Sequence, residues 1–170
     1  MADIKISIAK TLVNEGGYDN DPNDSGGATK YGVTQRDITG LPGFPTDVKD
    51  LTEAQATDYY EHHYWAKFGG AGHFAQVNFP MIEDQPVLDK LLDMSVLFGV
   101  GEAVILIEGV LGLVADGLFG PHDLVAVNEA EPTSLVQGFK TVLVSHAIGI
   151  ANAQPKDREF LAGWIKRINS

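Results

Sequence analysis

Residues 12–35 read LVNEGGYDNDPNDSGGATKYGVTQ and contain the sharpest structural signals in the chain. An apolar helical pattern ends in this stretch at Glu15, because the two glycines at 16 and 17 stop a helix. Residues 18–32 are rich in Asp, Asn, Gly and Pro, a composition typical of a loop, and a short hairpin is predicted around residues 28–34. The stretch therefore predicts a helix, a loop and a hairpin, with a carboxyl group at the end of the helix.

The helix that ends at Glu15 has one apolar side, and Asp3 is placed to cap its start. The residues on that side recur at i, i+4, i+8 and i+11, namely Ile4, Ile8, Leu12 and Glu15. Partial burial and the negative end of the helix dipole both disfavour the charged form of a carboxyl group there. A general acid that works near neutral pH requires such an environment.

Two further oxygen-bearing side chains, Asp24 and Thr29, follow Glu15 closely in the sequence. If the loop folds back over the helix end, both side chains face Glu15 across a cleft. Hydrolysis of a glycosidic bond uses one group to protonate the leaving oxygen and a second to activate water or attack the sugar carbon. A glutamate before two glycines is also common as a solvated helix end, and an aspartate in such a loop also forms Asx turns. Spacing alone leaves these interpretations open.

The rest of the chain is predominantly helical, with a loss of pattern near residue 80 that suggests a soft boundary between residues 1–80 and 81–170. Further helices are predicted over residues 52–68, 86–97, 102–113, 133–153 and 155–168. The last of them carries an apolar stripe made of Phe160, Leu161, Trp164, Ile165 and Ile168. The expected fold is mainly α with one small β-rich region.

The 170-residue chain has a net charge of −11 and no cysteine, which excludes a disulfide framework and a thiolate metal site. Such a charge repels the phosphates of nucleic acid and anionic membranes, so no nucleic-acid partner is expected. The N-terminus lacks the apolar stretch of a signal peptide, and the apolar run 103–115 is too short to span a bilayer. We expect a soluble monomer made in the cytoplasm, without stable membrane insertion.

Metal sites are not expected. A calcium loop beginning at Asp19 would place Asp24 where glycine is needed and Lys30 where the bidentate glutamate belongs. His62 and His63 are neighbours on a predicted helix and lack the spacing of zinc ligands. We therefore expect neither a metal nor an organic cofactor.

The EGGY run at residues 15–18, with Pro22, Asp24, the glycines at 26 and 27, Thr29 and the YGVT run at 31–34, resembles the start of glycoside hydrolase family 108 muramidases. Looser similarity continues in an aromatic-rich helix with Tyr60, Tyr64 and Trp65, a DGxxGP turn at 116–121 and an FLxGWxxR segment at 160–167. One departure lies after Asp93, where the family pattern DxAVNxG has its asparagine replaced by Leu97.

The resemblance implies a lysozyme-like fold, mainly α, with a short β-hairpin in its N-terminal lobe. Residues 1–80 would form the catalytic lobe, and residues 81–170 a helical half similar to the family's predicted peptidoglycan-binding region, packed on the first as one unit. Glu15 would be the catalytic acid, and Asp24 and Thr29 would position the hydrolytic water.

Three residues near the proposed catalytic loop are candidate substrate contacts: Tyr18, Tyr31 and Gln35. The two tyrosines flank that loop and can stack on sugar rings. The expected reaction is hydrolysis of the β-1,4 bond between N-acetylmuramic acid and N-acetylglucosamine in peptidoglycan. The favoured setting is a phage lysis enzyme that reaches the cell wall after a holin opens the membrane. The alternative is a non-catalytic peptidoglycan-binding or secretion-assisting protein.

The net charge of −11 predicts an unusual response to salt, because long-range repulsion from an anionic cell wall slows association. We expect wall-clearing activity to rise as the salt concentration rises toward physiological strength. Turbidity loss of a wall suspension in a sodium chloride series measures this. A rate that falls steadily from the lowest salt concentration would contradict the prediction.

Overall fold

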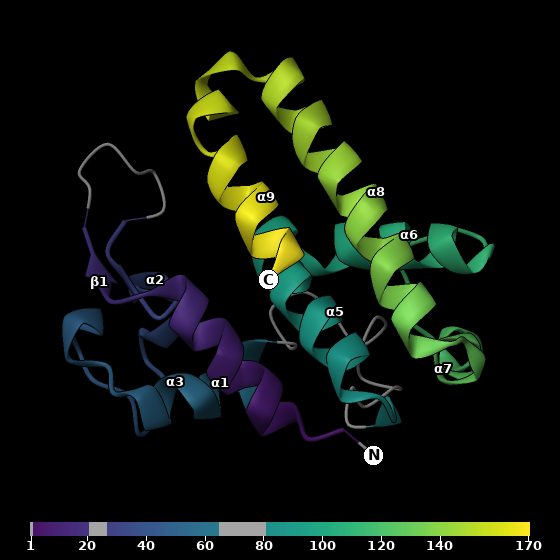
Figure 1. Cartoon of the computed structure of the whole chain (residues 1–170). Helices are drawn as coiled ribbons and strands as arrows, with labels where there is room; N and C mark the ends of the chain where they lie inside the picture. Colours follow the sequence, from purple (N-terminus) through teal and green to yellow (C-terminus); the bar gives the residue numbers. More distant parts are fainter. Residues whose placement is uncertain (1, 21–26, 65–80) are drawn as a thin grey trace.

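The computed structural model describes residues 2–20, 27–64 and 81–170, and it is mainly helical with a small sheet near the N-terminus, as expected (Figure 1). Its α-helices are α1 (Ile4–Glu15), α2 (Gln35–Ile38), α3 (Glu53–Tyr59), α5 (Gln85–Phe98), α6 (Val100–Leu111), α7 (Pro121–Glu129), α8 (Pro132–Ala153) and α9 (Leu161–Asn169). Shorter turns are the 3-10 segments η1 (Val48–Asp50) and η4 (Pro155–Glu159) and the π-helical segment η2 (Tyr60–Tyr64).

The sheet has three short antiparallel strands in the order β1 (Tyr18–Asp19), β2 (Thr29–Lys30), β3 (Val33–Thr34). The hairpin predicted around residues 28–34 is confirmed as β2 and β3. Tyr31 and Gly32 form its turn, with φ values of 55° and 72°. Two consecutive left-handed residues match the twist of the paired strands, as in the tight turns that favour glycine. The sequence did not predict β1.

Most helix ends lie where the sequence places them, because caps and stops are encoded locally. Asp3 accepts a hydrogen bond from the Lys5 N–H at 2.9 Å and starts α1, and Gly16, with φ of 76°, ends it. Asp84 caps the start of α5 in the same way, and Gly99 follows its last residue.

The structure differs from the sequence prediction at several places. Residues 155–159 form a 3-10 segment, so the last α-helix begins only at Leu161. Phe160 belongs to the predicted apolar stripe, but it is 52% exposed. The short helix α2 and the helix α7 were not predicted. The part of the predicted helix 52–68 beyond residue 64 lies outside the described residues.

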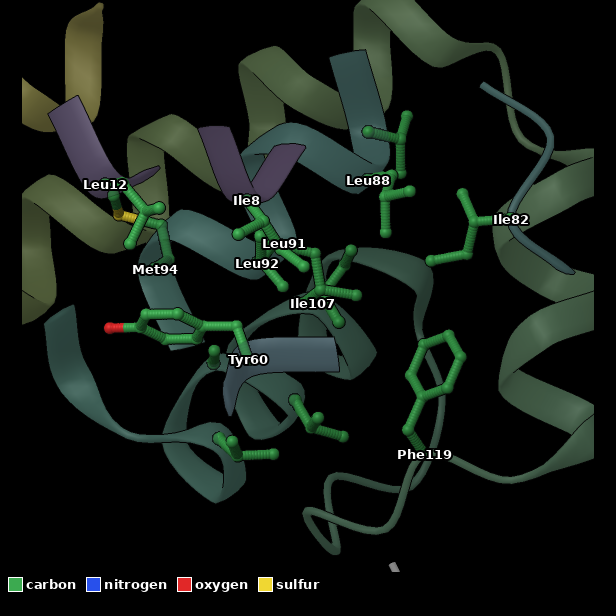
Figure 2. Close-up of a cluster of buried hydrophobic side chains, with 14 of the residues drawn as sticks. Ile8, Leu12, Tyr60, Ile82, Leu88, Leu91, Leu92, Met94, Ile107 and Phe119 are labelled. Carbon is green, nitrogen blue, oxygen red and sulfur yellow. The ribbon is translucent and has the colours of Figure 1, made fainter. Parts of the chain in front are cut away.

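One hydrophobic core joins residues from both parts of the chain. Figure 2 shows Ile8 of α1 near Leu91 and Leu92 of α5, and Leu12 of α1 near Met94 of α5. Ile107 of α6 and Phe119 belong to the same buried cluster. The proposed division at residue 80 remains a prediction.

Polar contacts fix the position of α1 along α5. The Ser7 hydroxyl donates to Asp89 Oδ1 at 2.6 Å, and Lys10 forms an ion pair with the same carboxylate. The Gln85 amide donates to the carbonyl of Asp3 at 3.1 Å. These bonds hold the N-cap and the first half of α1 against α5, and so they set the direction in which the helix runs to Glu15.

Lysines hold the C-terminal end of α9. Lys90 of α5 is buried, and its Nζ donates to the carbonyls of Ile168 at 2.9 Å and Arg167 at 3.3 Å. Lys140 of α8 donates to the carbonyls of Asn169 and Ser170, both at 3.0 Å. Cations are favourable at this end of a helix, where carbonyls lack partners. The end of α9 is therefore tied to α5 and α8.

By length and composition alone, α8 is apolar enough to cross a membrane, as are core helices of many soluble proteins. This is weak evidence for a membrane role. The expectation of no stable membrane insertion stays a prediction.

Lys90 predicts a specific pH dependence of stability. Burial lowers the pKa of Lys90 to about 8, although Asp93 acts in the opposite direction, whereas an unfolded chain keeps the ordinary value of about 10.4. Between these values the unfolded state binds more protons, so the contribution of Lys90 to the free energy of unfolding rises with pH. Compared with Lys90→Met, the unmodified protein should gain stability from pH 7.5 to 9.5 in urea unfolding. A constant difference across this range would contradict the prediction.

Candidate active site

Glu15 is the last residue of α1, and its side chain is 18% exposed. The structure therefore confirms a partly buried carboxyl group at the negative end of the helix dipole. The hairpin of β2 and β3 adjoins one side of this carboxyl, and α9 approaches the other.

Arg167 of α9 joins Glu15 to a second carboxylate. Its Nη2 donates to Glu15 Oε1 at 2.6 Å and to Asp93 Oδ1 at 2.8 Å, and its Nε donates to the same Asp93 oxygen at 3.1 Å. Asn14 also donates to this oxygen, at 3.1 Å. Three helices, α1, α5 and α9, thus meet at one guanidinium group.

Arg167 is charged in this environment. Burial alone would lower its pKa, but the hydrogen bonds and charge of Asp93, with those of Glu15, raise the pKa of Arg167 above its ordinary value. Arg167 is a partner of Glu15 that burial and the helix dipole alone did not predict.

The other oxygen of Glu15 lies on the side of the hairpin. A Cβ atom added at Gly32 would lie 2.8 Å from Glu15 Oε2 and 2.6 Å from the Tyr60 hydroxyl oxygen. The hairpin backbone thus packs directly against the carboxyl group, at a position where only glycine fits. Tyr60 is buried, and its hydroxyl donates to the carbonyl of Tyr31 at 3.2 Å. This bond ties the hairpin turn to η2.

The remaining predicted catalytic residues stay predictions. Thr29 is half-buried in β2, the strand that leads into the Tyr31–Gly32 turn. Asp24 lies outside the described residues. Nothing described here places either side chain against Glu15.

The candidate substrate contacts differ in their surroundings. Tyr18 lies on β1 and is 45% exposed, so its ring is open to a ligand. Tyr31 is half-buried, with the Lys30 ammonium 5.5 Å from its ring centre. Gln35 uses its amide within the protein: it donates to the carbonyl of Thr46 at 2.9 Å and accepts from the Val48 N–H at 2.8 Å. All three contacts to substrate remain predictions.

Four residues around Glu15 were not predicted as site residues: Gly32, Tyr60, Asp93 and Arg167. Arg167 closes the FLxGWxxR segment, and Asp93 begins the segment that departs from the family pattern. Both segments were recognised from the sequence, but neither residue was assigned a function. Leu97, the departing residue, is half-buried and packs against the core. In the described part of the chain, no group of three or more His, Asp or Glu side chains is arranged to hold a metal ion.

Comparison with solved structures finds a similar fold in "Structure of Brucella abortus SagA". The match has a TM-score of 0.72 and 27% sequence identity, and it covers 97% of this chain and 91% of that chain. The fold is accordingly mainly α and lysozyme-like. Comparison with the curated proteins finds no match.

The family model described as "Glycosyl hydrolase 108" matches residues 8–99, which include Glu15, Gly32, Tyr60 and Asp93. The chain therefore belongs to the glycosyl hydrolase 108 family and is a peptidoglycan hydrolase-like protein of the glycoside hydrolase class. Arg167 lies beyond the matched residues, within the part covered by the structural likeness.

Replacing Arg167 by glutamine tests the bridge. The substitution leaves Asp93, whose side chain is 9% exposed, without its counter-charge. We expect the free energy of unfolding to fall by about 3 kcal/mol, the size typical of a broken buried pair. The double variant Asp93→Asn with Arg167→Gln should recover part of this loss. Urea unfolding measures both, and an Arg167→Gln protein as stable as the unmodified one would contradict the prediction.

Replacing Gly32 by alanine tests the contact between the hairpin and Glu15. The new methyl group must displace the Tyr60 hydroxyl or the Glu15 carboxyl, so we expect glycan hydrolysis to fall at least about tenfold, as misplacement of a reacting group does. Gly40→Ala is the control, because Gly40 has a similar φ of 79° and open space around it. Gly40→Ala should share the backbone strain but keep its activity. Equal activity losses in both variants would contradict the prediction.

Proposed function

We propose that the protein is an N-acetylmuramidase that hydrolyses the β-1,4 bond between N-acetylmuramic acid and N-acetylglucosamine in peptidoglycan. The observation that supports this most directly is the asymmetric environment of the Glu15 carboxyl. Arg167 holds Oε1, whereas Oε2 lies beside the exposed Gly32 on the hairpin side. A carboxyl group held in this way is oriented for proton transfer, which an acid catalyst requires.

In the proposed reaction Glu15 donates its proton from Oε2 to the glycosidic oxygen, and the bond from that oxygen to the anomeric carbon breaks. A water molecule positioned by Asp24 and Thr29 attacks the anomeric carbon, and Asp24 accepts the proton that this water loses. Tyr18 and Tyr31 contact the sugars on the hairpin side, with Gln35 as a third contact. The chemistry needs neither a metal nor an organic cofactor.

The proposed biological setting is lysis of a bacterial host by a phage. The enzyme would be made as a monomer in the host cytoplasm and would reach the cell wall after a holin opens the membrane. Family membership supports peptidoglycan as the partner.

Glu15→Gln tests the proposal, because the amide keeps the size of the carboxyl group but has no proton to donate as an acid. We expect the variant to lose clearing of purified peptidoglycan by at least about a hundredfold, the range of general acid catalysis. Mass analysis of the products of the unmodified protein should show reducing ends on muramic acid. Glu83→Gln, which changes an exposed carboxylate elsewhere, should clear walls normally.

Equal clearing by Glu15→Gln and the unmodified protein would assign the acid to another residue. Reducing ends on glucosamine would contradict the muramidase assignment. If neither protein clears walls but both bind them, the non-catalytic binding or secretion-assisting function is the better description.

A further inference from the structure

Four residues of the closing FLxGWxxR segment, Phe160, Gly163, Trp164 and Arg167, lie on adjoining sides of the last helical segment, which contacts Glu15 through Arg167. Arg167, which binds Glu15, lies seven residues after Phe160, and seven residues make almost two helical turns. The Trp164 N–H donates to the Phe160 carbonyl at 3.0 Å, so the helical turn includes Phe160. Phe160 and Arg167 are therefore nearly in line along the helix, about 10 Å apart along its axis.

The side of α9 about a quarter turn away from Phe160 packs on the protein. Ile168 is buried, and Leu161 packs against the core. Trp164 lies between the two sides and is partly buried. Gly163 is exposed and Phe160 is 52% exposed, whereas Arg167, at the other end of the line, is largely covered by its contacts with Glu15 and Asp93.

This face combines an exposed aromatic ring with a bare stretch of helix. Phe160 is 52% exposed, an unusual position for so large an apolar side chain. A Cβ atom added at Gly163 would meet nothing within 4 Å, so the helix surface between Phe160 and Arg167 is open. A glycine inside an exposed helix lowers helix stability by about 1 kcal/mol relative to alanine. Nothing in the packing of α9 requires that glycine.

The aromatic ring has a rigid support. The ring centres of Phe160 and Trp164 lie 6.2 Å apart with an angle of 30° between the rings. Trp164 in turn packs edge-on against Phe98 of α5, with ring centres 6.0 Å apart. Phe98 also packs edge-on against His146 of α8, with ring centres 5.1 Å apart. Phe160 is thus the exposed end of an aromatic cluster that α5 and α8 hold in place.

We infer that this face of α9 is one wall of a glycan-binding subsite that leads away from Glu15. An N-acetylhexosamine ring would pack over Gly163, with Phe160 and Trp164 against its apolar face. The inference rests on the proposed function for the identity of the glycan. It adds a site in the C-terminal half, separate from Tyr18, Tyr31 and Gln35.

Two observations favour sugar rings over the stem peptides of peptidoglycan. Between Phe160 and Arg167 this face presents Gly163 and Trp164, which carry no charge to pair with the carboxylates of a stem peptide. Sugar rings instead offer C–H faces that pack on aromatic side chains. The second observation is that this face adjoins the Arg167–Glu15 pair, so one glycan strand could occupy both sites.

Leucine substitutions in α9 test the subsite without disturbing the core. Gly163→Leu fills the open surface, whereas Ala162→Leu adds the same side chain at the neighbouring exposed position off this face. Both are made in the Glu15→Gln protein, and binding to peptide-free glycan strands from amidase-treated peptidoglycan is measured. We expect Gly163→Leu to weaken binding at least tenfold and to raise the Tm, because leucine forms helix better than glycine. Ala162→Leu should bind normally.

Phe160 is tested by a pair of substitutions in the same background. Phe160→Ala should weaken binding about fivefold, the size of one aromatic contact, and Phe160→Tyr should restore it. In the protein with Glu15 intact, Gly163→Leu should raise KM about tenfold and change kcat less than twofold. A fall in kcat at unchanged KM would instead indicate an effect through Arg167 and would overturn the inference.

The outcomes separate this inference from the proposed function. Normal glycan binding by Gly163→Leu overturns the subsite even if Glu15 proves to be the acid. Weaker binding in Gly163→Leu supports the subsite even if Glu15→Gln still clears walls. Weakening that is confined to peptide-bearing fragments would assign the face to stem peptides and overturn the glycan assignment.

Discussion

The arrangement of the site depends on one guanidinium group that binds two carboxylates. Arg167 can reach Glu15 and Asp93 together only if α1, α5 and α9 converge within hydrogen-bonding distance. Hydrogen bonds farther from Arg167 help to hold the three helices in this arrangement. The Ser7–Asp89 bond sets α1 along α5, and Lys90 holds the carbonyls of the last turn of α9. A buried cation between two acids is costly unless all its partners are in place, so the three helices are constrained together.

The hairpin restricts the Glu15 carboxyl group from the side away from Arg167. Gly32 approaches Glu15 so closely that the backbone of the turn limits where the carboxyl group can lie, while Tyr60 holds the turn from behind. An arginine on one oxygen and a backbone wall near the other leave Glu15 little freedom to rotate. Such restriction is what preorganised acid catalysis requires, since a reacting group that is already oriented loses less entropy in the transition state.

Much of the fold follows from local signals in the sequence. Asp3 with Gly16, and Asp84 with Gly99, mark their helices because capping involves neighbours within a few residues. The partly buried carboxyl at the end of α1 followed from periodicity and the two glycines. The contact of Arg167 with Glu15 did not, because the two residues are 152 positions apart and a helical repeat does not identify the partner of a face. Phe160 shows the same difficulty: its apolar character placed it in the predicted stripe with Leu161 and Ile168, but at the start of α9 it is 52% exposed.

The same separation in sequence has a consequence for biosynthesis. A chain made from its N-terminus exposes Glu15 early, while the residues of α9 are added only after the rest of the helical half. Contacts between distant positions form late, since a long loop must close before they repay its entropy. A growing chain therefore contains Glu15 before it contains the arginine that binds it. The orienting contact appears only when nearly the whole sequence has been translated and folded.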